Sequence, residues 1–93
     1  MKRRFRNLIG PQVRALRWKR RLTQEALAAQ LQVAGAIGLD RVKLAKIESQ
    51  IRSVFDYELL AIAHVLGVSP GQLAPKNKVL FEKLPVLSAW TEK

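Results

Sequence analysis

The chain has 93 residues, a formal net charge of +10 and no cysteine. This length suits one small domain with a single core. The lack of cysteine excludes a disulfide framework and a thiolate zinc site, and no apolar run reaches the roughly eighteen residues that a membrane span needs. Nine of the seventeen Lys and Arg residues lie in residues 1–21, which contain no Asp or Glu. This concentration of charge favours a polyanion as partner over a merely solvated basic tail.

Residues 1–8 are expected to form a short basic arm, because they show no apolar period. Such an arm either contacts phosphates or a minor groove, or it is a frayed terminus. The basic start is similar to the front of a signal peptide, but arginines and a lysine interrupt the apolar region that should follow. We therefore expect a cytoplasmic protein with no membrane contact.

The first helix is predicted over residues 10–20. Pro11 falls at the start of this helix, where its missing N–H costs nothing. Ile9, Val13 and Leu16 recur at near-helical spacing and define the side that faces the core.

A second helix is predicted to follow Thr23, which is a suitable N-cap residue, and to end near Gln32. Its buried side consists of Leu27, Ala28 and Leu31. Residues 33–39 contain two glycines and small apolar side chains, which predict a turn.

The third helix is predicted over residues 41–49, with Asp40 as its N-cap. Helical spacing directs Leu44 and Ile47 into the core. The opposite side carries a mixed basic and small-residue face made of Arg41, Val42, Ala45, Lys46 and Ser49. A helix of this kind can rest on a core and press its other side into a groove of DNA.

A fourth helix is predicted over residues 56–66, with Gly67 as its C-terminal stop. Its expected apolar face is Leu59, Leu60, Ile62, Ala63 and Leu66. Residues 69–72 have the pattern of a capping box with proline at the first helical position, which predicts a short fifth helix that Pro75 ends.

The tail, residues 76–93, is rich in apolar side chains and is divided by Pro85. These side chains would be poorly placed in water, so we expect them to cover the domain or a second copy of it.

Three groups of residues, in this order along the chain, carry a resemblance to a known family. They are Leu22-Thr23-Gln24-Glu25 with Leu27-Ala28, then Leu44-Ala45-Lys46-Ile47-Glu48, and then Asp56-Tyr57-Glu58-Leu59-Leu60-Ala61-Ile62-Ala63 leading into Leu66-Gly67-Val68-Ser69. Over about residues 9–74 the chain resembles the helix-turn-helix domain of the Xre/Cro-type prokaryotic and phage regulators. The resemblance implies an all-α, compact, lambda-repressor-like domain of five helices in residues 9–75. The basic arm of residues 1–8 would precede this domain, and the apolar tail of residues 76–93 would follow it.

The resemblance implies that the second and third helices form the helix-turn-helix, with the third in the major groove of DNA. Arg41 and Val42, with Lys46 one turn later, would then face base edges. A bidentate Arg41 would bind guanine O6 and N7, which is worth about 1–3 kcal/mol of discrimination, and Val42 would contact a thymine methyl group. Lys43 and Lys46 are as well suited to phosphate as to bases.

Four further residues match family positions outside this reading face. Gln24 matches a position that anchors to the DNA backbone or an adjacent base, and Arg52 matches a phosphate-contacting region. Arg17 and Glu48 occupy the positions of an ion pair that ties the first helix to the recognition helix.

Two features depart from the family pattern. A helix-turn-helix normally has a turn of about 3–4 residues, and the connector here, residues 32–39, is about twice that length. The second departure is Arg21, since the family favours glycine at this position. If the position needs a positive φ, arginine carries some strain there.

The leading functional hypothesis is a sequence-specific DNA-binding regulator that acts as a homodimeric repressor by covering its operator, and that is associated with the nucleoid when bound. The candidates for the dimer contact are Trp18, Phe81, Leu84, Leu87 and Trp90. One alternative is an antitoxin-like module that grips a protein partner through the apolar tail at residues 79–90 and also binds DNA. Another is a small basic RNA-binding protein, which the charge alone suggests.

An enzyme is not expected. His64 is the only histidine, and the seven carboxylates are scattered and mostly suit caps or ion pairs. No phosphate-binding glycine loop, metal-ligand cluster or nucleophile motif occurs. We therefore predict no cofactor and no metal.

Overall fold

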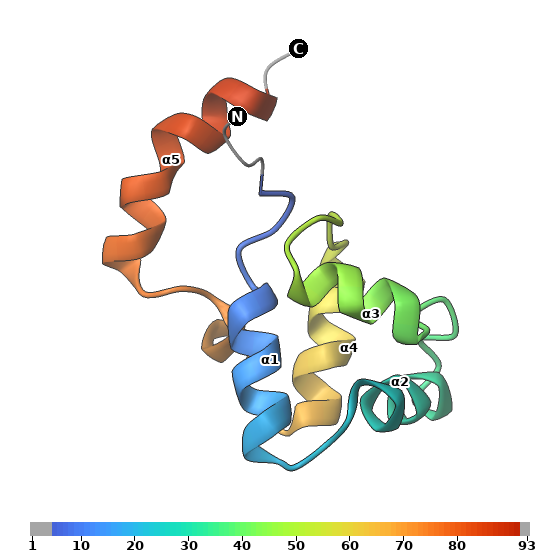
Figure 1. The fold of residues 1–93 in the computed structure, drawn as a ribbon. Coiled ribbons are helices and arrows are strands. Elements are labelled where there is room, and N and C mark those ends of the chain that lie inside the picture. The colour runs from blue at the N-terminus through green and yellow to red at the C-terminus, as the bar shows by residue number, and fades with distance from the viewer. Residues whose placement is uncertain (1–4, 92–93) are drawn as a thin grey trace.

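The computed structural model describes residues 5–91, which form helices joined by short connectors and contain no strand. The helices are α1 (Gly10–Lys19), α2 (Gln24–Val33), α3 (Arg41–Glu48), α4 (Asp56–Leu66), the short 3₁₀ helix η1 (Pro70–Leu73) and α5 (Asn77–Thr91). Helices α1 to η1 pack together, and α5 extends away from them (Figure 1). The predicted all-α fold is confirmed. No helix in the described part of the chain is long and apolar enough to cross a membrane.

Local side-chain chemistry sets the ends of the bundle helices. The hydroxyl of Thr23 accepts a hydrogen bond of 3.0 Å from the backbone N–H of Ala26 at the start of α2. Asp40 accepts one of 2.9 Å from the N–H of Lys43 at the start of α3. Gly67, at φ +71°, ends α4 in the left-handed conformation that favours glycine. The predicted helix boundaries therefore lie within one residue of those observed for α1 to α4.

One hydrophobic core joins the bundle helices. Its buried members come from every helix of the bundle and from the connector before α3: Val13, Leu27, Ala28, Leu31, Leu39, Leu44, Ile47, Ile62, Ala63, Leu66 and Leu73. The prediction for Leu60 is wrong, because its side chain is 54% exposed. One residue beyond the half-buried Leu59, it is turned by about 100° around the helix, away from the core.

The long connector between α2 and α3 is a folded turn. Gly35 takes φ +105°, and the N–H of Ala36 donates to the carbonyl oxygen of Leu31 at 2.8 Å. Leu39, just before the cap of α3, is fully buried. The extra residues therefore bulge outward while Leu39 anchors the entry to α3.

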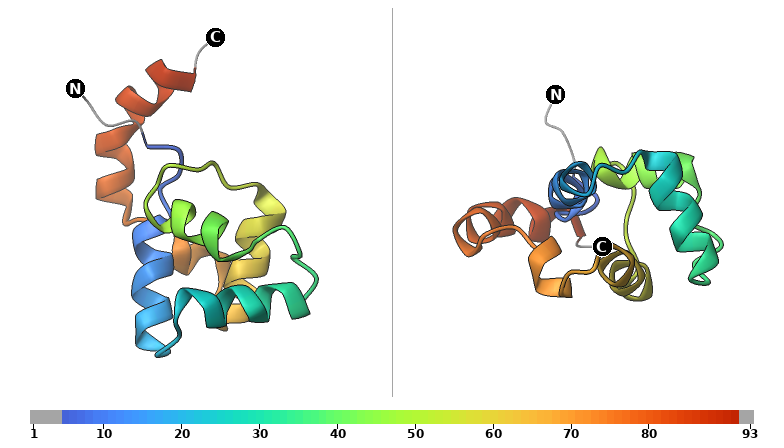
Figure 2. Two further views of the ribbon diagram at one scale, coloured as in Figure 1. Left: turned by 45° about the vertical axis from the view of Figure 1, so that its right-hand side comes forward. Right: turned by 90° about the horizontal axis from the view of Figure 1, so that it is seen from below.

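The tail forms α5, a single helix, so the expectation that Pro85 divides it is wrong. No glycine interrupts residues 77–91, and the helix continues although the proline ring removes one backbone hydrogen bond. The helix does not cover the bundle in this chain (Figures 1 and 2). Phe81 is 64% exposed, and Val79 and Val86 are also exposed.

Residues 5–8 of the predicted arm lie between the bundle and α5. The ammonium group of Lys83 lies 4.7 Å from the centre of the Phe5 ring, and the N–H of Arg6 donates to the carbonyl oxygen of Gln50 at 2.9 Å. This half of the arm is therefore held against the domain. Residues 1–4, the rest of the predicted arm, lie outside the described residues.

Candidate nucleic-acid interface

Helix α3 separates a buried side from a basic exposed side. Leu44 and Ile47 are completely buried, and the last residue of the helix, Glu48, is also buried. The exposed side chains of the helix are those of Arg41, Val42, Lys43 and Lys46. Because Glu48 is buried, the outward side of α3 carries only positive charge.

An open groove runs along this outward side. It is lined by Arg41, Val42, Ala45, Lys46, Ser49 and Ile51. Three of these side chains are aliphatic and two are basic, so the groove has an apolar floor beside positive charge. Arg41, Val42 and Lys46 were expected to read DNA, and the structure brings them together here. Ile51, which is 55% exposed, was not predicted.

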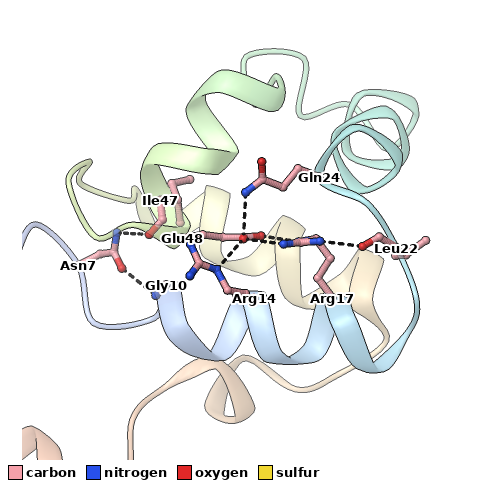
Figure 3. A network of polar contacts seen from close by, with 8 residues as sticks. All are labelled: Asn7, Gly10, Arg14, Arg17, Leu22, Gln24, Ile47 and Glu48. Atoms are coloured by element: carbon pink, nitrogen blue, oxygen red, sulfur yellow. Dashed lines mark hydrogen bonds and ion pairs between the residues drawn. The ribbon is translucent and has the colours of Figure 1, made fainter.

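Glu48 binds side chains from two other helices (Figure 3). Arg17 of α1 donates from Nε to Oε2 at 2.7 Å and from Nη2 to Oε1 at 3.0 Å, so this pair is bidentate. Gln24 of α2 donates to Oε1 at 3.1 Å, and Arg14 of α1 does so at 3.3 Å. Arg17 and Glu48 thus form the ion pair that the family resemblance implies, and both are buried, at 7% and 3% exposed.

Burial of Glu48 alone would raise its pKa. The hydrogen bonds from Arg17 and Gln24 and the positive charge of Arg17 outweigh this effect, so the pKa of Glu48 lies below its ordinary value. Arg17 also donates from Nη1 to the carbonyl oxygen of Leu22 at 2.8 Å, which fixes the α1–α2 connector just before the N-cap of α2. Among the described residues, no buried side-chain nitrogen or oxygen lacks a partner.

Gln24 and Arg52, two of the predicted DNA contacts, are bound within the chain. The Gln24 amide donates to Glu48, as described above. The guanidinium of Arg52 donates from Nη1 to Oε1 of Glu58 at 2.9 Å and from Nη2 to Oε2 at 3.1 Å. Both residues remain partly exposed. Gln24 thus supports the end of α3 through Glu48, and Arg52 holds the loop that follows α3.

Glu58, in the first turn of α4, closes the loop that follows α3. Its Oε1 also accepts the backbone N–H of Phe55 at 3.0 Å. The hydrogen bonds from Arg52 are the largest cause that lowers the pKa of Glu58, and burial opposes them. The same pair raises the pKa of Arg52. The loop from Gln50 to Phe55 is thereby tied to α4.

Asn7 joins the start of α1 to the end of α3 (Figure 3). Its side-chain amide donates to the carbonyl oxygens of Ile47 at 3.0 Å and Arg52 at 2.8 Å, and its Oδ1 accepts the N–H of Gly10 at 2.8 Å. At Gly10 the two helices touch backbone to backbone, because a Cβ atom there would collide with the carbonyl oxygen of Ile47. The end of α3 therefore has a fixed position on α1.

Sequence reasoning missed Asn7, Glu58 and the close approach at Gly10. Glu58 had a usable signal, since it stands three residues after Phe55, the N-cap of α4, and a glutamate at this spacing often reaches back to the N-cap N–H. The contacts that tie Asn7 and Gly10 to α3 had no local signal, because both residues meet the carbonyl oxygen of Ile47, about forty residues away in the sequence. Only the three-dimensional arrangement brings them together.

Comparison with solved structures finds a relative of this chain. The chain is similar to the restriction-modification controller protein C.AhdI from Aeromonas hydrophila, whose crystal structure superposes with a TM-score of 0.61 at 32% sequence identity. The match covers 70% of this chain and 86% of that protein. No family model matches the chain, and no curated protein does. The matched share, the identity and the arrangement of α1 to η1 together show that the chain belongs to the helix-turn-helix regulator family that includes this controller protein.

Proposed function

We propose that this chain is a sequence-specific DNA-binding regulator of transcription, with α3 as the helix that enters the major groove. The observation that carries the proposal is the open groove on the outward side of α3, with Arg41 and Lys46 beside the aliphatic Val42. Membership of a family that contains a controller protein supports it. The role needs no cofactor and no catalysis, and it places the protein in the cytoplasm at the nucleoid.

The groove combines the two chemistries that base recognition needs. Arg41 stands at the first position of α3, where a guanidinium can donate to both O6 and N7 of guanine. Val42, 51% exposed, offers an aliphatic surface to a thymine methyl group. Lys43 and Lys46 add positive charge along the helix, which suits the phosphates on either side of the major groove of DNA.

We further propose that the protein acts as a homodimer that represses transcription by occupying its operator. Two copies related by a two-fold axis would present their α3 helices about 34 Å apart, to successive major grooves. The exposed apolar side chains of α5 suit the dimer contact, since a 15-residue helix without packing is marginal in water. Trp18 is exposed near the C-terminal end of α1, the end away from α5 (Figure 1), so it belongs to a different surface.

The test of DNA reading is selection of bound duplexes from a random pool at near-physiological salt. The wild-type chain is compared with an Arg41→Ala, Lys46→Ala variant, and RNA is added as competitor. We expect the wild type to enrich an inverted repeat and the variant to lose it. If binding is strong only at low salt without enrichment, the positive charge acts by counterion release alone and the proposal fails. Equal competition by RNA would favour the RNA-binding alternative.

The test of the dimer is sedimentation of the wild type and of Leu84→Glu at high micromolar concentration. Leu84 is half-buried on α5, outside the bundle, so a charge there should spare the fold. We expect a wild-type dimer and a monomeric variant. A wild type that stays monomeric would contradict the dimer and would favour the antitoxin-like alternative, in which α5 binds another protein. If Leu84→Glu stays dimeric, the dimer contact does not depend on Leu84, and the assignment of this contact to α5 is wrong.

A further inference from the structure

The turn that follows α1 contains an arginine in a backbone conformation that is unusual for this residue type. After the last helical residue, Lys19, the chain turns at Arg21, whose φ is +57°. The N–H of Arg21 donates to the carbonyl oxygen of Trp18 at 2.9 Å, and the N–H of Leu22 donates to that of Arg17 at 3.0 Å. These two hydrogen bonds define a helix ending in which the left-handed residue is usually glycine. Arginine costs stability at such a position, because its Cβ crowds the backbone.

The end of α3 has the same geometry and provides an internal comparison. Gln50 has φ +65°, and the N–H groups of Gln50 and Ile51 donate to the carbonyl oxygens of Ile47 and Lys46. Here the side chain has a structural use, since its amide donates to the carbonyl oxygen of Asn7 at 3.1 Å. The hydrogen bond from the Gln50 side chain thus offsets, within the fold, the backbone strain that a side chain causes at this positive φ.

Arg21 has no such use within the fold. Its side chain is exposed and makes no hydrogen bond or ion pair with any described residue, Glu25 of α2 included. The preceding arginine differs, because Arg20 donates from Nη1 to the carbonyl oxygen of Val65 at 3.3 Å. An arginine that strains the backbone, and whose side chain binds none of the residues that the structure describes, points to a partner outside the fold.

The position of Arg21 indicates what that partner is. The view from below in Figure 2 shows the α1–α2 connector and α3 on the same side of the bundle, opposite α4. Arg21 is three residues before Gln24, the first residue of α2, and Gln24 contacts Glu48 at the end of α3. A duplex seated against the outward side of α3 would therefore pass within reach of a long side chain from this connector.

We propose that Arg21 is a positioning residue that binds a phosphate of the DNA backbone beside the groove occupied by α3. The inference rests on the proposed function and adds a contact that fixes the docking of α3 without reading bases. A guanidinium suits this role because it donates two parallel hydrogen bonds to phosphate oxygens. Arginine at position 21 then lowers the stability of the fold through backbone strain and raises the affinity for DNA through the phosphate contact.

The test replaces Arg21 by glycine, because this change should move stability and binding in opposite directions. Arg21→Gly removes the strain, so the Tm should rise by about 4–8 °C, the shift expected for about 1 kcal/mol in a domain of this size. Affinity for the duplex selected by the wild type should fall several-fold. The slope of log K against log salt should become shallower by about 0.9 per bound protomer, because one phosphate contact is lost.

Three control variants test whether the loss of the positive charge at position 21 causes the change in salt slope. Arg21→Lys keeps the charge and should keep most of the salt slope. Lys78→Ala removes an exposed charge on α5, outside the bundle, and should leave the slope unchanged. Gln50→Gly removes the strain at the other non-glycine residue that has a positive φ among the described residues, without changing the charge, and should also leave the slope unchanged. Because Arg21→Gly should be the more stable protein, a loss of binding cannot come from unfolding.

The outcomes separate this inference from the proposed function. If the wild type selects a duplex and Arg21→Gly binds it with unchanged affinity and salt slope, Arg21 contacts no phosphate and the inference is wrong. If the wild type selects no duplex, the proposed function itself fails, and the inference fails with it. A variant with a lower Tm would show that arginine is the better residue for this turn, which also overturns the argument from strain.

Discussion

Glu48 and Glu58 are both buried carboxylates that accept two hydrogen bonds from one arginine, but the distances they span along the chain differ. Glu48 pairs with Arg17, 31 residues earlier, and also binds a residue of α2. Glu58 pairs with Arg52, six residues earlier, and binds the N–H of Phe55. Glu48 therefore fixes the angle of α3 against α1 and α2. Glu58 fixes only the local loop that follows α3.

This difference shows how a small bundle can hold a reading helix without using the side of that helix that faces DNA. The contacts described above that orient α3 come from its buried side or from its end, so they do not use the exposed side chains of Arg41, Val42 and Lys46. The same difference predicts that Glu48 contributes more than Glu58 to the stability of the domain. Losing the long-range contact should disturb the whole domain, whereas losing the local one should loosen a single loop.

The largest effect is expected for Glu48→Ala. This change leaves Arg17 buried beside a cavity without its carboxylate, and removing one partner of a buried pair costs about 3–5 kcal/mol. The Tm should fall by more than about 10 °C, and DNA binding should weaken only as a consequence. Thermal unfolding followed by circular dichroism measures the shift, with the exposed Glu25→Ala as control. An unchanged melting temperature would contradict the structural role of Glu48.

A smaller effect is expected for Glu58→Gln. The amide keeps the shape of the side chain but loses the charge, and its NH₂ group cannot accept from Arg52. The expected cost is about 1–2 kcal/mol, since hydrogen bonds to charged groups are worth about 1.5–3 kcal/mol and this pair is partly exposed. Hydrogen exchange should quicken at the N–H of Phe55 while the amides within α1 stay protected. Uniformly faster exchange would show that Glu58 also supports the whole domain.

The pH dependence of stability should reflect both carboxylates. Their pKa values lie below the ordinary 4.5 in the folded chain. The folded state therefore binds fewer protons than the unfolded state in this range, so their contribution is complete above about pH 4.5 and is lost as the pH falls through the lower folded values. Urea unfolding between pH 7 and pH 2 should show this loss in the wild type. Glu48→Gln should be less stable at neutral pH but should show a smaller loss on acidification, and a parallel profile would contradict the assignment.

Sequence reasoning found the helices because their boundaries depend on local chemistry. Thr23, Asp40 and Gly67 act on neighbours within a few residues, so their roles are visible in the sequence. The pair of Arg17 and Glu48 was accessible only through the family resemblance, since no local pattern joins residues so far apart. Asn7 was missed for the same reason. The tail was misread because a single proline was given more weight than the good helix formers before it, Glu82, Lys83 and Leu84.

Among the predicted site residues, those on the exposed side of α3 were found through helical spacing. Val42 and Lys46 share one face because they are four residues apart, and Arg41 lies beside Val42 at the start of the same groove. Gln24 and Arg52 were assigned to DNA alone, because the sequence gives no sign that Gln24 reaches Glu48 or that Arg52 reaches Glu58. A side chain's partners inside the fold depend on packing between helices, which periodicity does not determine.

The most direct test of base reading by α3 is the binding of Arg41→Ala to a panel of duplexes. The panel contains the selected site with each base pair changed in turn, and binding is measured at one salt concentration for the wild type, for Arg41→Ala and for Lys43→Ala. We expect Arg41→Ala to lose about 1–3 kcal/mol of discrimination at one base pair of each half-site and to keep the rest. Lys43→Ala should weaken all duplexes alike. If Arg41→Ala also weakens every duplex by the same factor, Arg41 binds phosphate, and the first turn of α3 does not read bases.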